Sequence, residues 1–206
     1  MITLFIDTSS SDVSIAILRG DDLVYSITKS IPNKHSIYTV SFIEEAISKS
    51  NLEPKDINQI MVVNGPGSFT GLRIGVTIAK TYAYLNNIKI IPVSALKMLS
   101  LSIDHEFCLS LIDAHHDNYY IGLYDKDNIE VIEEEFNSVD RVLELIDKYN
   151  PTVVSCDNIN NSIKVDKVDI DISNIYSFYK DKVAINAHLL VPDYLKLPQA
   201  LEGKND

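Results

Sequence analysis

This sequence contains no tryptophan, only two cysteines and only three arginines, and its apolar runs are short. The cysteines, Cys108 and Cys156, are too few for a disulfide framework, so we expect both thiols to be reduced. No uninterrupted apolar stretch approaches the ~18 residues that a membrane-spanning helix needs. The opening residues, MITLFIDTSS, lack the basic segment that begins a signal peptide. We therefore expect a globular cytoplasmic protein that does not contact a membrane.

The scarcity of arginine also limits the partners that this chain can bind alone. The formal net charge is −11, and Arg19, Arg73 and Arg141 are far apart in the sequence. Strong binding to a nucleic-acid backbone depends on clustered cations, which this chain does not offer. If the protein serves RNA chemistry, we expect another subunit to supply most of the basic surface.

Hydrophobic periodicity predicts a mixed α/β organisation in the first half of the chain. Three short strands are expected first, and apolar residues at helical spacing then predict a helix over 35–49. Strands and helices alternate after that point. A strand meander followed by this alternation predicts a mixed sheet flanked by helices. The expected strands are 2–7, 12–18, 23–29, 59–63 and 88–93, and the further helices are 70–86 and 95–101.

The second half has a weaker pattern, which favours a reduced second lobe. We expect strands at 106–112, 118–124, 129–135 and 152–156, a helix at 138–149 and a short helical piece near 183–190. The boundary is placed near residue 103. This divides the chain into an N-terminal lobe of residues 1–103 and a reduced C-terminal lobe of residues 104–206.

The segment 64–75, NGPGSFTGLRIG, is the most informative stretch, because four of the seven glycines lie in it. An apolar strand leads into it and a helix follows, so backbone N–H groups and a helix N-terminus meet at the turn. No Gly-Lys-Ser/Thr follows, which excludes a Walker A loop. Gly65 and Gly67 are consistent either with a cradle for a phosphate or with a sharp turn that allows close packing of helix on sheet.

Two further segments place polar side chains at strand ends. Asp7, Thr8 and Ser9 follow the first strand and are able to bind a phosphate or a hydrated metal, or to close an ordinary hairpin turn. Asp113 follows a later strand, and His115 and Asp117 could share a face with it. An identified fourth ligand is missing, so we expect no metal site. The sequence also lacks a nucleophile elbow and a CxxC motif.

The helix expected over 70–86 is apolar on more than one side. Leu72, Val76, Ala79 and Ala83 form one stripe, and a second stripe consists of Ile74, Ile78, Tyr82 and Leu85. A helix on a sheet needs one apolar face for its own core. The second face is covered either by the helix over 35–49 or by a partner subunit. The candidate partner interface consists of Ile37, Val40, Ile43, Leu72, Gly75, Val76, Ala79, Tyr82 and Ala83.

Together, these segments resemble the TsaB (YeaZ) family of bacterial tRNA threonylcarbamoyladenosine proteins. The resemblance rests on FIDTSS at 5–10, the glycine segment at 64–75, IPVSAL at 91–96, LIDAHHDNYYIGLY at 111–124 and VPDYLKLPQALE at 191–202. It implies an actin/Hsp70/sugar-kinase-like (ribonuclease H-like) fold with a reduced second lobe. It also implies a homodimer in isolation, a TsaD-like catalytic partner, a TsaE-like ATPase and contact with tRNA only through the complex.

The departures from the catalytic relatives point to a scaffold without chemistry of its own. TsaD carries a metal-binding His-x-x-x-His pair, and the matching positions here are Ala95 and Leu99. The family often has a glycine-containing segment after its late strand, whereas residues 154–158 here carry side chains, and His115 replaces the usual arginine. The resemblance therefore implies that a nucleotide cleft formed by Asp7, Thr8, Ser9, Gly65, Gly67 and Asp113 is degenerate. The chain itself is expected to require no cofactor, with at most weak ATP or ADP binding at a subunit interface. The alternative is an active nucleotide-dependent kinase or transferase of the same fold.

Overall fold

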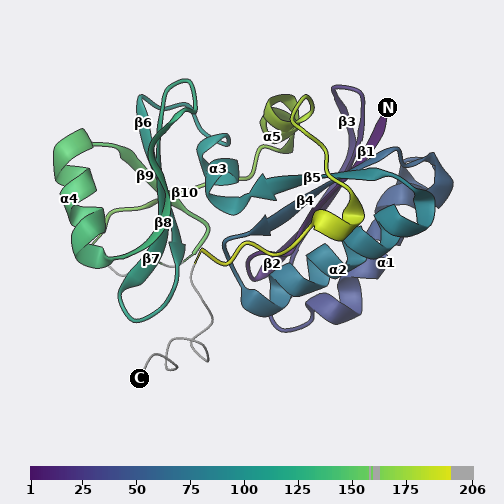
Figure 1. The fold of residues 1–206 in the computed structure, drawn as a ribbon, viewed down its shortest axis with the longest axis horizontal. Coiled ribbons are helices and arrows are strands. Elements are labelled where there is room, and N and C mark those ends of the chain that lie inside the picture. Colours follow the sequence, from purple (N-terminus) through teal and green to yellow (C-terminus); the bar gives the residue numbers. More distant parts are fainter. Residues whose placement is uncertain (158, 160–162, 196–206) are drawn as a thin grey trace.

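The computed structural model describes residues 1–157, 159 and 163–195, which fold into two lobes with one five-stranded sheet each (Figure 1). The strand order is β3-β2-β1-β4-β5 in the first sheet and β10-β9-β6-β7-β8 in the second. Both sheets mix parallel and antiparallel pairs and carry helices on their faces. The predicted α/β class, two lobes with mixed sheets flanked by helices, is confirmed.

The first sheet joins an antiparallel meander to parallel strands. Its strands are β1 (Ile2–Asp7), β2 (Asp12–Arg19), β3 (Asp22–Ser30), β4 (Gln59–Gly65) and β5 (Lys89–Ser94). β4 pairs parallel with both β1 and β5, and parallel neighbours need a crossover connection. Helices α1 (His35–Lys49) and α2 (Phe69–Asn86) form these crossovers, and the short η1 (Pro54–Asp56) leads into β4.

The two crossover helices cover one face of this sheet. Alternate residues of the strands, such as Ile6 and Val62, point to this face and pack against Val76 and Ala79 of α2. Burying one such aliphatic side chain contributes roughly 1.5–3 kcal/mol, so this core anchors α2 firmly on the sheet. The helix thereby begins at the same edge at which β1 and β4 end.

The opposite face is covered by α3 (Ala95–Ser100) and α5 (Ile172–Tyr179). Ile172, Ile175 and Tyr176 of α5 pack with Phe5 of β1 in one buried cluster. The periodicity of the sequence did not predict α5, because this helix is short and lies in a polar stretch. Its apolar residues nevertheless follow the i, i+3, i+4 spacing of one helical face.

The second sheet contains β6 (Phe107–Asp113), β7 (Asn118–Asp125), β8 (Glu130–Ser138), β9 (Thr152–Ser155) and β10 (Asp166–Lys167). Helix α4 (Val139–Tyr149) covers its outer face, where Val142 and Leu145 are buried. Its inner face meets α3 through Leu99, Cys108 and Val154. Among the helices of the described ranges, none is long and apolar enough to cross a membrane.

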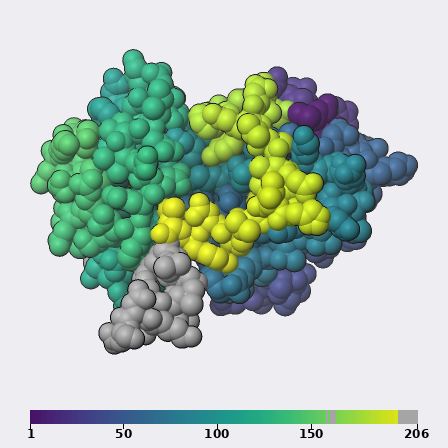
Figure 2. Space-filling view, viewed as in Figure 1, coloured from purple at the N-terminus to yellow at the C-terminus, as the bar shows by residue number. Residues whose placement is uncertain are grey.

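The predicted division into residues 1–103 and 104–206 needs a correction, because the chain returns to the first lobe. α5 packs on the first sheet, Ile185 bridges Ile90 of β5, and η2 (Ala187–Leu189) packs near α2. Residues 183–195, which we name the return strap, then run across the first lobe toward the second (Figure 2). Apolar residues such as Leu190 find their burial in the core of the first lobe, and this draws the chain back. The last residues of the predicted second lobe, 196–206, lie outside the described residues.

Candidate functional site: the interlobe cleft and the paired helices

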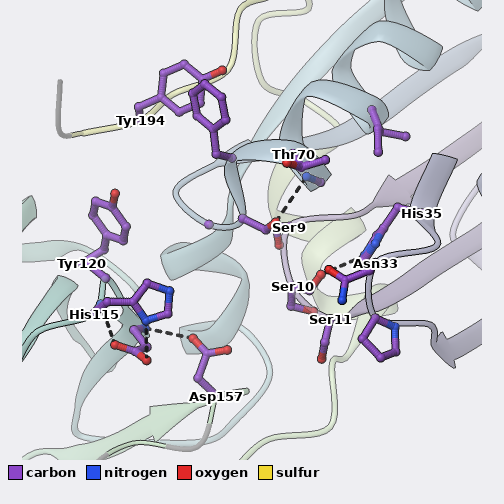
Figure 3. A pocket seen from close by; sticks show the side chains of 18 of the residues that line it. Ser9, Ser10, Ser11, Asn33, His35, Thr70, His115, Tyr120, Asp157 and Tyr194 are labelled. Carbon is purple, nitrogen blue, oxygen red and sulfur yellow. Dashed lines mark hydrogen bonds and ion pairs between the residues drawn. The ribbon is translucent and has the colours of Figure 1, made fainter. Parts of the chain in front are cut away.

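A cleft of about 990 Å³ separates the two lobes. Its first-lobe wall consists of the turn after β1 and the N-terminal ends of α1 and α2, and its second-lobe wall consists of the turn after β6 (Figure 3). The residues that line it are Ser9, Ser10, Ser11, Pro32, Asn33, His35, Ser36, Gly67, Ser68, Phe69, Thr70, Gly71, Ile74, Asp113, Ala114, His115, His116, Tyr120, Asp157 and Tyr194.

The glycine segment packs against this protein's own backbone. A Cβ at Gly65 would lie 1.9 Å from the carbonyl oxygen of Asp193, and one at Gly71 would lie 2.0 Å from that of Thr8. A Cβ at Gly67 would lie 2.5 Å from the carbonyl oxygen of Ser9. The glycines thus allow the return strap and the β1–β2 turn to approach β4 and α2. Of the two roles that the sequence left open for this turn, close packing is the one that these contacts support.

The polar residues after β1 also serve this packing. Thr8 is fully buried, and its hydroxyl donates a hydrogen bond to the carbonyl oxygen of Gly71 (2.8 Å). Asp7 is buried and accepts a hydrogen bond from the backbone N–H of Ser9 (2.8 Å), while its burial raises the pKa of its carboxyl group. Ser9, Gly67 and Asp113 of the predicted nucleotide set line the cleft, whereas Asp7, Thr8 and the buried Gly65 lie behind its wall.

The second-lobe wall carries two aspartates, Asp113 at the end of β6 and Asp157 just after β9. The Asp157 carboxylate accepts a hydrogen bond from the backbone N–H of Asp113 (2.9 Å), and the Asp113 carboxylate accepts one from the backbone N–H of His115 (2.8 Å). Burial, together with the nearby charge of Asp113, raises the pKa of Asp157. His115, His116 and Asp117 have left-handed backbone conformations with φ of 64°, 56° and 57°. Asp113 lines the cleft at the start of this turn.

This wall does not assemble a metal centre. Over residues 1–157, 159 and 163–195, no group of three or more His, Cys, Asp or Glu side chains is placed to bind a metal ion. The sequence pattern of Asp113, His115 and Asp117 therefore does not become a ligand set. His115 instead pairs with its neighbour, since its Nδ1 lies 3.3 Å from Oδ2 of Asp113.

The charge of the residues that line the cleft does not favour binding of a nucleoside triphosphate. Among the described residues that line it, Asp113 and Asp157 are acidic and none is a lysine or an arginine. Charge-assisted bonds from such cations are the strongest protein contacts to phosphate. The N-terminal ends of α1 and α2 add a weaker attraction for anions.

Several residues of this site were missed by sequence reasoning. Tyr194 of the return strap lies against Phe69 with ring centroids 5.0 Å apart, and Nε of Arg73 donates a hydrogen bond to the Tyr194 hydroxyl (3.0 Å). His35 is buried, and its Nε2 lies 2.9 Å from the carbonyl oxygen of Ser10 (Figure 3). The only available signals were the position of His35 at the start of a helix and that of Tyr194 in the segment 191–202.

The paired helices require a correction to the predicted interface. Ile43, Leu72, Val76, Ala79 and Ala83 are buried inside this chain, and Gly75 packs against Thr8. Val76, Ala79 and Ala83 of α2 and Ile43 of α1 belong to the core cluster that also contains the strand residues of the first sheet, so these side chains face the sheet. Tyr82 is half-buried and donates a hydrogen bond to the carbonyl oxygen of Pro54 (2.6 Å).

What remains exposed is a smaller apolar area on α1. Ile37 and Val40 are 64% and 53% exposed, one helical turn apart. The exposed ring of Tyr38 stacks with that of Phe42, with centroids 6.0 Å apart. We call Ile37, Tyr38 and Val40 the α1 surface. Ile37 and Val40 belong to the predicted interface, Tyr38 lies beside them, and all three are exposed.

Comparison with known proteins agrees with this architecture. Residues 29–201 match the family model of TsaD, tRNA N6-adenosine threonylcarbamoyltransferase. The tRNA threonylcarbamoyladenosine biosynthesis protein TsaB of Bacillus subtilis (strain 168) is 30% identical over 97% of this chain and 96% of its own. The TsaB of Buchnera aphidicola subsp. Baizongia pistaciae is 26% identical over 93% and 96%. The structure of YeaZ from Pseudomonas aeruginosa shares the fold, with a TM-score of 0.76 at 19% identity over 94% of this chain and 99% of that one.

Proposed function

Because this chain belongs to the TsaB family of tRNA threonylcarbamoyladenosine biosynthesis proteins, we propose that it is a non-catalytic scaffold of the modifying complex. In this role it binds a TsaD-like catalytic subunit and helps to recruit a TsaE-like ATPase. It forms a homodimer when that partner is absent. It reaches tRNA only through the complex, in the cytoplasm.

The observation that supports the proposal is that backbone atoms of this chain occupy the space beside the glycines of the segment 64–75. The space that a phosphate would need next to Gly65 and Gly71 is occupied by Asp193 and Thr8. Burying those backbone contacts supports the packing of α2 and the return strap, and it leaves only the outer part of the cleft open.

The positions at which the resemblance places a metal-binding pair argue in the same direction. Ala95 and Leu99 both belong to α3 and are buried in apolar clusters. Neither side chain has an atom that coordinates a metal. The proposal therefore assigns the chemistry to the TsaD-like partner.

The α1 surface supplies a contact for that partner. When another chain covers adjacent exposed aliphatic and aromatic side chains, apolar surface leaves water and the free energy of the system falls. Fully burying one of these side chains contributes roughly 1.5–3 kcal/mol, so losing Ile37 or Val40 from an interface should weaken binding strongly. The same surface can serve a homodimer and a heterodimer in turn, since only one partner covers it at a time.

The test is the solution mass of the chain by multi-angle light scattering, alone and mixed with the TsaD-like protein of the same organism. We expect a one-to-one complex that forms at the expense of a homodimer. Val40→Glu should leave a folded monomer that no longer forms the complex. The matched control is Val183→Glu, because Val183 is 85% exposed on the return strap, away from α1.

Two results would contradict the proposal. If Val40→Glu retains the full assembly mass, the α1 surface is not the interface. If the wild-type chain forms no complex and its melting temperature rises with Mg-ATP, the alternative of an active nucleotide-dependent enzyme gains support instead. A site occupied at 100 times its Kd should stabilise the fold by about 2.7 kcal/mol.

A further inference from the structure

A polar cluster lies at the junction of the two lobes, around the N-terminus of α3, with Lys97 and Tyr124 buried and Ser94, Asn128 and Glu134 half-buried. It is formed by residues of three separate segments. Ser94 and Lys97 belong to the β5–α3 corner of the first lobe, and Tyr124, Asn128 and Glu134 belong to the β7–β8 hairpin of the second. Phe178 and Tyr179 come from α5. No step of the proposed function uses these residues.

Lys97 makes the first link between the lobes. Its side chain is only 5% exposed, although lysine is normally a surface residue. Its Nζ donates a hydrogen bond to the backbone carbonyl of Asn128 (2.6 Å) and lies 3.7 Å from the ring centroid of Tyr124. Both partners are in the second lobe, so the hydrogen bond and the cation–π contact cross the junction.

Glu134 makes the second link. Its carboxylate accepts hydrogen bonds from the hydroxyl of Ser94, across the junction, and from the hydroxyl of Tyr124 (2.8 Å) within its own sheet. The backbone N–H of Ser94 in turn donates to the hydroxyl of Tyr179 (3.2 Å). The corner of the first lobe is thereby tied both to the second sheet and to the returning helix.

Such a cluster is costly unless its members stay together. A buried charged or polar group that loses its partner suffers the full desolvation penalty, so a satisfied network strongly disfavours any arrangement that pulls it apart. Within the described residues the chain crosses between the lobes at 101–106 and 168–171, and a small apolar cluster and the hydrogen bond from the Ser100 hydroxyl to Oδ1 of Asn128 (2.9 Å) also join them. Two adjacent crossings of this kind are compatible with a hinge.

We propose that Ser94, Lys97 and Glu134 form a latch that fixes the second lobe against the first and suppresses hinge closure of the cleft. The latch keeps Asp113 and Tyr120 of the second lobe at a constant distance from the first-lobe wall. The chain then presents itself as one rigid body. The latch is independent of whether a TsaD-like partner binds.

The competing explanation is that apolar packing alone holds the junction. Leu99, Cys108 and Val154 form a small buried cluster there, with Ile103 packed against it. These contacts remain when the polar links are removed. Variants that change only the polar links therefore separate the two explanations.

The experiment compares the wild-type chain with Lys97→Met and Ser94→Ala by hydrogen–deuterium exchange and small-angle X-ray scattering. We expect amide hydrogen exchange in the β7–β8 hairpin and α3 to become about tenfold faster. Losing one of these hydrogen bonds lowers the free energy of local opening enough to raise the population of the open state by roughly that factor. We also expect a scattering curve that indicates more than one lobe arrangement.

Two control variants remove trivial effects. Ser94 also caps α3 by accepting a hydrogen bond from the N–H of Lys97 (3.1 Å), so Ser68→Ala, which removes the equivalent cap of α2, reports the loss of a cap alone. Lys180→Met removes a lysine that pairs with Asp21 within the first lobe (2.6 Å). Neither control should alter exchange at the junction.

The proposal is overturned if both latch variants exchange and scatter like the wild-type chain. It is also overturned if they only melt at lower temperature while junction exchange and scattering stay unchanged, because the residues then stabilise the fold without fixing the lobes. Should Lys97→Met fail to fold, Ser94→Ala decides the question, since it keeps every apolar contact and the lysine in place.

Discussion

Replacing Gly65 by alanine tests whether the glycine segment serves packing or a ligand. Gly65 has a backbone φ of 144°, which residues other than glycine rarely adopt. A Cβ added at this position would lie 1.9 Å from the carbonyl oxygen and 2.8 Å from the carbonyl carbon of Asp193. Both are backbone atoms, so a side-chain rotation cannot relieve the clash. The return strap must shift away from β4 instead.

The magnitude follows from the contacts that this shift removes. Backbone strain at such a position costs about 1–3 kcal/mol. The hydrogen bonds from Asp193 N to Asn64 O (2.7 Å) and from Asn64 Nδ2 to Val191 O (3.2 Å) would be weakened, at about 1 kcal/mol each. We therefore expect Gly65→Ala to lower the free energy of unfolding by about 3–5 kcal/mol.

The assay is urea unfolding together with limited proteolysis of the strap, with Gly20→Ala as the matched control. Gly20 also has a positive φ, of 59°, but a Cβ there meets no atom within 4 Å. The difference between the two variants isolates the clash with the strap. The reasoning is refuted if both variants lose the same stability and the strap of Gly65→Ala stays as resistant to protease as in the wild-type chain.

The remaining predictions concern the core, the latch and the cleft. Val76→Glu should unfold the first lobe instead of only blocking association, because Val76 is 3% exposed in the main core; a folded monomer by circular dichroism would contradict this. Burial lowers the pKa of Lys97 from 10.5 to about 8. The nearby charge of Lys182 lowers it further, and the carboxylates of Glu130, Glu134 and Asp125 act in the opposite direction without cancelling the shift. The unfolded chain therefore binds this proton more tightly than the folded chain does, and the folded state gains stability as the pH rises. Between pH 8 and pH 10.5, the free energy of unfolding of the wild-type chain should rise by up to about 3 kcal/mol relative to that of Lys97→Met. Urea unfolding at the two pH values measures this difference. Mg-ATP should leave the melting temperature of the isolated chain nearly unchanged, and a clear rise would contradict the degenerate cleft.

The amino-acid sequence by itself determined the fold class and the local elements. Alternating and helical periodicities depend only on neighbours along the chain, and they predicted the strands from β1 to β9 and the helices from α1 to α4 to within a few residues. The glycine segment marked the strand–turn–helix that forms one wall of the cleft. Its two possible roles could not be separated, because the atoms that touch Gly65 belong to residue 193.

The tertiary structure alone decided which faces are free and which groups meet. The stripe of Leu72, Val76 and Ala79 pointed to an interface in the sequence, but the sheet that covers it is built from strands elsewhere in the chain. α5 and the return strap joined the first lobe because their few apolar residues complete its cores. Lys97 and Glu134 are 37 positions apart and show no pattern, yet folding brings the buried Lys97 and the half-buried Glu134 to one junction. Contacts between distant residues depend on how complete elements pack, and local periodicity carries no information about that.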